Sequence, residues 1–116
     1  LLMCGRLNVS DDPFVTKLLF NLGIDKPEET MRYGRFIGAA NVVSIVREKD
    51  QSRQLDDASW WLLQEPTEAG FKPSRYTSFN TRYDKLHTPR SAGYKAYQES
   101  RCVIVVKGFG ETEFKP

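Results

Sequence analysis

Apolar positions near the start of the chain follow two different periods. Alternation over residues 3–9 predicts a short strand, because successive side chains of a strand point to opposite faces. Apolar residues spaced three and four apart predict an amphipathic helix over 13–22. Ser10, Asp11 and Asp12 followed by Pro13 suit its start, since such side chains cap free N–H groups and proline lacks the N–H that would stay unpaired. Gly23 favours its end.

The rest of the chain is dominated by short apolar and β-branched runs separated by polar segments. These runs predict strands at 42–46, at 59–63, at 102–106, which is the strongest, and from 108 onwards, with weak alternation at 76–80. We expect a hairpin connection at 48–57, loops at 24–33 and 65–74, and a short helix over 91–100. The run at 102–106 is so apolar that it needs neighbours, either earlier strands or strands beyond this chain.

These elements predict an α+β fold: one mixed domain with a curved, largely antiparallel, barrel-like sheet and few helices. The length of 116 residues allows one domain, and 40% hydrophobic residues suffice for a core. No apolar run approaches the roughly 20 residues of a membrane span, so we expect no membrane partner. Two cysteines and one histidine cannot complete a typical four-ligand zinc site, so we expect neither a metal nor a cofactor.

The net positive charge lies in the second half of the chain: residues 1–58 carry 8 basic and 9 acidic side chains, whereas residues 59–116 carry 9 basic and 6 acidic ones. Residues 71–107 hold eight Lys and Arg against two acidic residues, interleaved with six Phe and Tyr. Cations neutralise phosphates and aromatic rings stack on bases, so this mixture is a weak indication of single-stranded nucleic-acid binding. The alternative is an ordinary solvated surface whose aromatic residues belong to the core.

Few residue types in the chain are suited to catalysis. Cys4 is a candidate nucleophile, and removal of everything through Met3 would pair its thiol with a free α-amine. Such a 1,2-aminothiol converts an aldehyde into a five-membered thiazolidine; the alternative is a small buried side chain. We expect Cys102 to be buried inside its strand and His87 to be a surface residue. Glu111 is either a general acid/base or an exposed turn residue.

Several segments, taken in order, resemble one protein family. They are MCGR at 3–6, FNTRYD at 79–84, and SRCVI at 100–104 followed by GFGE at 108–111, with WLL at 61–63 as a partial echo of a W-G-L motif. The family is SRAP, the "SOS response-associated peptidase" domain, whose members shield abasic sites in single-stranded DNA. Its segments span nearly the whole chain.

This resemblance implies a role for three residues in catalysis. The amine of Cys4 would form a Schiff base with the ring-opened sugar of an abasic site, and its thiol would close the thiazolidine, giving a DNA–protein crosslink. Asn80 would orient the amine or the sugar, and Glu111 would shuttle protons. The residues expected to contact DNA are Arg6, Trp61, Arg82 and Lys107.

The resemblance also implies an enzyme of the DNA-damage response that acts on abasic sites and processes its own N-terminus. Its partner would be single-stranded DNA, and the protein would be a monomer in a bacterial or phage-infected cytoplasm or in a eukaryotic nucleus. We expect residues 1–116 to form the N-terminal portion of such a domain, without the C-terminal portion that carries the family's catalytic histidine. The alternatives are a non-catalytic single-strand-binding module and a degenerate remnant of the family.

Overall fold

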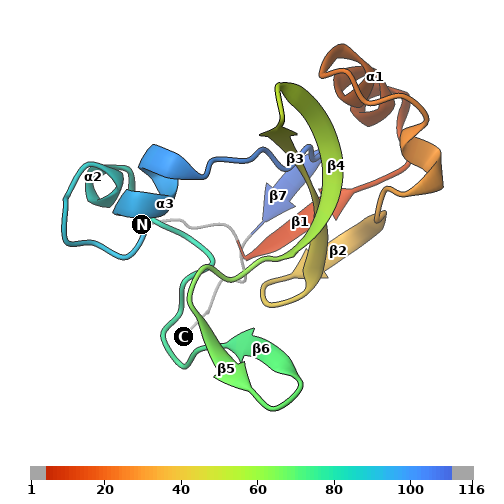
Figure 1. Ribbon diagram of the computed structural model, residues 1–116. Coiled ribbons are helices and arrows are strands. Elements are labelled where there is room, and N and C mark those ends of the chain that lie inside the picture. Colours follow the sequence, from red (N-terminus) through yellow and green to blue (C-terminus); the bar gives the residue numbers. More distant parts are fainter. Residues whose placement is uncertain (1–4, 111–116) are drawn as a thin grey trace.

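The computed structural model describes residues 5–110, which form three small antiparallel sheets and a few short helices (Figure 1). The three-stranded sheet has the order β2-β1-β7, with bounds Gly34–Gly38, Arg6–Val9 and Gly108–Gly110. The two hairpins are β3 with β4, at Val42–Lys49 and Ser52–Ser59, and β5 with β6, at Gln64–Thr67 and Gly70–Pro73. The helices are α1 at Pro13–Asn21, α2 at Tyr83–Leu86, α3 at Tyr94–Glu99, and a single 3-10 turn at Pro27–Glu29.

The expected α+β fold with few helices and antiparallel strands is confirmed. The barrel-like closure is not found, because the sheets of residues 5–110 remain separate and are not joined into a barrel. Helix α1 lies on one side of the sheets in Figure 1, and α2 with α3 lies on the other. No helix within this part of the chain is long and apolar enough to cross a membrane.

Helix α1 forms almost where its apolar spacing and caps predict. The Asp12 carboxylate accepts a hydrogen bond from the backbone N–H of Phe14 at 2.8 Å, and Pro13 is the first helical residue. Gly23 follows the helix with a φ of +92°, a conformation that favours glycine. Val15 and Leu19 are completely buried, so the helix is held by its apolar face.

The core lies between α1, β1 and β3. The buried apolar residues come from these elements, from the segment after α1 and from the chain before β7: Leu7, Val9, Val15, Leu19, Ile24, Met31, Val43, Val46 and Val105. Strand β1 is the middle strand of its sheet, and its alternate residues Leu7 and Val9 face this core. Both β2 and β7 are therefore held against a strand that is itself fixed by core packing.

The segment at 48–57, expected to be a hairpin connection, consists mostly of strand. Only Asp50 and Gln51 turn, both with positive φ of 53° and 66°, as a two-residue hairpin turn with the right-handed twist requires. The charged side chains of the hairpin pair across the strands, as with Arg47 and Asp56. Because an antiparallel sheet can leave one face in water, charge does not exclude a strand.

Two expected strands are wrong. Strand β4 ends at Ser59, and the backbone of Trp60 bonds to the turn before β3 through Ala40 N–H and Asn41 C=O. Of the run at 102–106, only Val103 forms a β-bridge, with Val46. At these positions the backbone N–H and C=O groups are satisfied by isolated hydrogen bonds to a turn or by a single bridge, so no further strand forms.

Other local expectations meet mixed outcomes. Residues 65–74, expected to be a loop, form most of the β5–β6 hairpin, and 76–80 is not a strand. The helix expected over 91–100 forms as the shorter α3, whereas β2 and α2 were not expected. The neighbour of the run at 102–106 is an earlier strand, because Val103 bridges to Val46 of β3, and β7 likewise pairs with β1.

Substitution of Leu19 by alanine tests whether the buried face of α1 holds the fold. We expect Leu19→Ala to lower the free energy of unfolding by about 2–5 kcal/mol, because a fully buried leucine leaves a cavity. The neighbouring Phe20 is 66% exposed, so Phe20→Ala should change it by no more than about 0.5 kcal/mol. Urea denaturation followed by circular dichroism measures both; equal losses would contradict the proposed packing.

Candidate functional site

The start of β1 and the end of β7 bring two distant parts of the chain together. Gly5 N–H donates to the carbonyl of Gly110 at 2.8 Å, and Arg6 is paired with Gly110 in the antiparallel register. A Cβ placed on Gly5 would meet only that carbonyl, at 3.9 Å, and one on Gly110 would meet nothing within 4 Å. Cys4 and Glu111 lie outside the described residues, and each is covalently joined to one of these two glycines.

A hollow of about 260 Å³ lies beside β7. It is lined by Leu7, Trp60, Asn80, Ile104, Val106 and Phe109. Leu7 and Phe109 are cross-strand partners, so both side chains lie on the same face of the sheet. Asn80 contributes an amide to a lining of otherwise apolar and aromatic residues. Phe109 is 76% exposed, so the hollow is open to solvent on the β7 side.

Two tryptophans fix the residue that precedes Asn80. The indole N–H of Trp60 donates to the carbonyl of Phe79 at 2.9 Å, and its ring meets the Phe79 ring edge-on with centroids 5.7 Å apart. The Trp61 ring lies 5.5 Å from Phe79. Three large rings therefore restrain the backbone at Asn80, although 76–80 has no regular secondary structure.

Ser78 also restrains the loop that carries Asn80, through two hydrogen bonds. Its hydroxyl accepts a hydrogen bond from Leu63 N–H at 2.9 Å, and its carbonyl accepts one from Leu62 N–H at 3.0 Å. The side chain of Ser78 is buried. These bonds tie the loop that carries Asn80 to the segment that follows β4.

The four residues expected to contact DNA do not gather at this hollow. Arg6 is exposed on β1 and, as the neighbour of Leu7, points to the opposite face of the strand. Trp61 is half-buried, and its indole N–H donates to the Ser74 carbonyl at 3.1 Å. Arg82 forms an ion pair with Asp84 at 3.1 Å.

Lys107 is directed toward α1. Its ammonium lies 2.8 Å from a carboxylate oxygen of Asp12, the residue that caps the helix. The hydrogen bond from Lys107, together with that from Phe14 N–H, lowers the pKa of Asp12 below its ordinary value of 3.8. This contact joins the segment before β7 to the N-terminus of α1.

Of the six residues that line the hollow, sequence reasoning identified Asn80 alone and missed five: Leu7, Trp60, Ile104, Val106 and Phe109. The run at 102–106 contained a usable signal, because Ile104 and Val106 face the hollow while the intervening Val105 is buried in the core. That alternation is the period of an extended chain, whether or not it joins a ladder.

Cys102 does not lie buried within a strand. It is an exposed free cysteine, although the atoms around the thiol desolvate it enough to raise its pKa. A raised pKa favours the protonated thiol over the thiolate, which is the nucleophilic form. His87 lies on the surface directly after α2.

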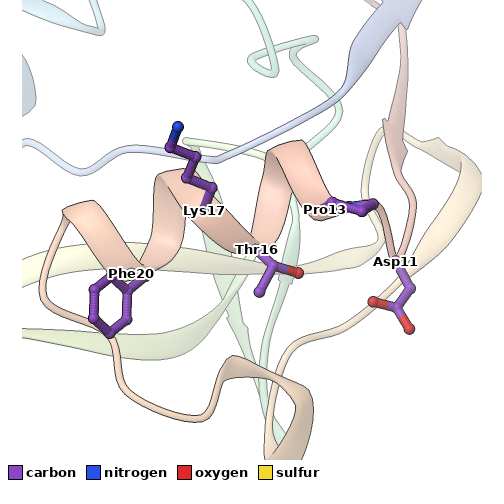
Figure 2. Close-up of a pocket in the computed structure, with 5 residues that line it drawn as sticks. All are labelled: Asp11, Pro13, Thr16, Lys17 and Phe20. Atoms are coloured by element: carbon purple, nitrogen blue, oxygen red, sulfur yellow. The ribbon is translucent and has the colours of Figure 1, made fainter.

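Two further observations bear on chemistry elsewhere. Within residues 5–110, no group of three or more His, Cys, Asp or Glu side chains could hold a metal ion. Another hollow, on the outer side of α1, is lined by Asp11, Pro13, Thr16, Lys17 and Phe20 (Figure 2). It includes none of the residues predicted to act in catalysis or DNA binding, so it is separate from the site described above.

Comparison with known proteins links the sequence of this chain to one family. A family model described as SOS response associated peptidase (SRAP) matches residues 3–115. No curated protein and no solved structure matches the chain.

Replacement of Ser78 tests how the Asn80 loop is held. Ser78→Ala removes the acceptor of Leu63 N–H at a buried position, so we expect it to lower the free energy of unfolding by about 1–3 kcal/mol. Thr77 is exposed, and Thr77→Ala should stay within about 0.5 kcal/mol of the wild type. Chemical denaturation of both variants measures the difference, and a loss confined to Thr77→Ala would refute this account.

The Asp12–Lys107 contact predicts a specific dependence of stability on pH. Because the pKa of Asp12 is lowered in the folded state, its contribution is present above the ordinary value of 3.8 and is lost as the pH falls through the folded pKa. Asp12→Asn keeps a capping side chain but no longer titrates. We therefore expect the urea midpoint of the wild type to fall more than that of Asp12→Asn between about pH 7 and about pH 2. Parallel falls would contradict the prediction.

Proposed function

The chain belongs to the SOS response associated peptidase (SRAP) family, and on that premise we propose that it forms a covalent crosslink with abasic sites in single-stranded DNA. Family membership supports an association with DNA abasic sites in general. The finer proposal is that Cys4 supplies both reacting atoms, after hydrolysis of the Met3–Cys4 peptide bond has freed its α-amine.

One observation carries this proposal. The hydrogen bond between Gly5 and Gly110 joins the residues to which Cys4 and Glu111 are attached. Phe109, the residue before Gly110, lines the same hollow as Asn80. A thiol with an amine, a carboxylate and an amide are the groups that imine and thiazolidine formation requires.

The proposed reaction balances with the release of one water molecule. The Cys4 amine attacks the aldehyde carbon of the ring-opened sugar, and the resulting carbinolamine loses water to give a Schiff base. The Cys4 sulfur then adds to the same carbon, and its proton passes to the nitrogen as the thiazolidine closes. Glu111 gives a proton to the departing hydroxyl and takes one back, while the Asn80 amide holds the sugar or the amine.

We propose that Arg6, Arg82 and Lys107 neutralise DNA phosphates and that Trp61 contacts a base. Arg82 and Lys107 would then exchange Asp84 and Asp12 for phosphate oxygens. Their ion pairs are solvent-exposed on the cation side, and exposed ion pairs contribute little to stability, so the exchange opposes binding only weakly. In this proposal the protein acts on DNA as a monomer.

A denaturing gel tests the proposal on matured protein incubated with single-stranded DNA that contains one abasic site. We expect a shifted covalent band that Cys4→Ser abolishes and that Cys102→Ser, the other cysteine of the chain, leaves at full yield. Asn80→Ala should slow band formation on the order of 100-fold, as loss of one positioned hydrogen-bond donor does in other enzymes. Intact mass spectrometry checks that the chain begins at Cys4.

Two outcomes would contradict this assignment. Matured Cys4→Ser keeps the α-amine but has no thiol, so a covalent band of full yield and stability in this variant would remove the thiazolidine from the proposal. Matured protein that binds DNA with no covalent band would instead support the non-catalytic single-strand-binding module.

A further inference from the structure

Four planar side chains form a continuous row across α2, α3 and the chain that follows. The rings of Tyr83 and His87 have centroids 5.1 Å apart, and those of His87 and Tyr97 lie 6.0 Å apart, both edge-to-face. The guanidinium of Arg101 sits 5.1 Å from the centroid of Tyr97. We call Tyr83, His87, Tyr97 and Arg101 the aromatic row. It depends on α2 and α3 packing side by side (Figure 1).

The aromatic row is not part of the core. Neither α2 nor α3 contains a buried residue, and no member of the row belongs to the core cluster or packs against it. Tyr83 is 77% exposed. Three rings and a guanidinium thus contact one another at the surface, which leaves the Tyr83 ring accessible to a planar ligand.

The surroundings of the aromatic row are basic. Residues 82–101 contain five Lys and Arg against two acidic residues, and all of these cations are exposed: Arg82, Lys85, Arg90, Lys95 and Arg101. One of the two acidic residues, Asp84, is paired with Arg82. The remaining excess of positive charge complements a polyanion whose monomers carry flat rings.

A groove of about 350 Å³ connects the aromatic row to the Asn80 site. Its lining includes Asn80 and Thr81 together with two members of the row, Tyr97 and Arg101. Gly93, just before α3, makes this proximity possible, because a Cβ there would lie 3.0 Å from the Thr81 hydroxyl. The start of α3 therefore rests directly on the segment that follows Asn80.

We propose that the aromatic row binds unpaired bases of single-stranded DNA next to the lesion, with Tyr83 stacking on a base and Arg101 neutralising a phosphate in the groove. This rests on the proposed function, because it deepens the description of that substrate. Aromatic stacking tolerates any base, since every base has a π-face. Bases inside a duplex are already stacked on their neighbours, so the row selects single strands.

The test measures binding of the full chain to a fluorescent, undamaged oligothymidylate by anisotropy. We expect Tyr83→Ala to weaken binding roughly 5- to 150-fold, the range that corresponds to stacking energies of about 1–3 kcal/mol per base. Tyr83→Phe keeps the ring and should bind like the wild type. Tyr76, 78% exposed and outside the row, is the matched control, and Tyr76→Ala should have no comparable effect.

Further measurements separate stacking from simple charge attraction. Lys95→Gln should reduce the salt dependence of binding without the large loss seen for Tyr83→Ala. Duplex DNA of the same length should bind wild type and Tyr83→Ala alike. Unchanged binding by Tyr83→Ala, an equal loss in Tyr76→Ala, or a loss confined to RNA or to duplex DNA would overturn the proposal.

The failure of this proposal is distinguishable from that of the proposed function. If abasic DNA is crosslinked while Tyr83→Ala binds undamaged DNA normally, the aromatic row is wrong and the covalent chemistry stands. If Tyr83→Ala loses affinity while the wild type forms no covalent band, the row stands and the crosslinking proposal is wrong.

Discussion

Strand β1 must satisfy three neighbours at once, and the arrangement of the molecule depends on it. One edge pairs with β2 and the other with β7, while Leu7 and Val9 fill the core beneath α1. Core packing at these two residues fixes the position of the strand. Its ladder then fixes where β7 ends, about one hundred residues further along the sequence. The juxtaposition of Gly5 and Gly110 is therefore a consequence of core packing at Leu7 and Val9 together with the β1–β7 register.

The other wall of the site is built without a sheet. Between β4 and α2, tryptophan N–H groups and the Ser78 hydroxyl supply hydrogen bonds that a ladder would otherwise provide. Such side-chain bonds have fixed partners, whereas a strand can slip in register by two residues. A loop held in this way can present Asn80 accurately without any regular secondary structure around it.

Sequence reasoning succeeded where a local signal and the final structure agreed. The apolar spacing and caps of α1 act within one helix, so they survive in the fold. Strand β4 escaped notice because its residues are mostly polar, and its identity depends on cross-strand pairing with β3. The strand predicted at 102–106 was wrong although its residues have high β-propensity. Propensity cannot create a partner strand, and Val103 alone pairs, through a single bridge to Val46.

The same distinction applies to the site. The family resemblance indicated Asn80, and the structure places it in an apolar hollow; Trp60, Ile104 and Val106 share that hollow through tertiary contacts alone. The interleaved basic and aromatic residues over 71–107 gave a weak indication of the surface that carries the aromatic row. Which of these aromatic rings lie at the surface and which are partly buried depends on the turns between them, and composition does not encode those turns.

The pairing of Lys107 with Asp12 has a consequence for communication across the molecule. An anion that binds the Lys107 ammonium takes it away from the carboxylate of Asp12, which caps α1. Conversely, protonation of Asp12 frees the Lys107 ammonium to bind the anion more tightly. By thermodynamic linkage the two effects are equal in size. The stability of the α1 N-terminus therefore depends on whether Lys107 binds an anion, although 95 positions of sequence separate Lys107 from Asp12.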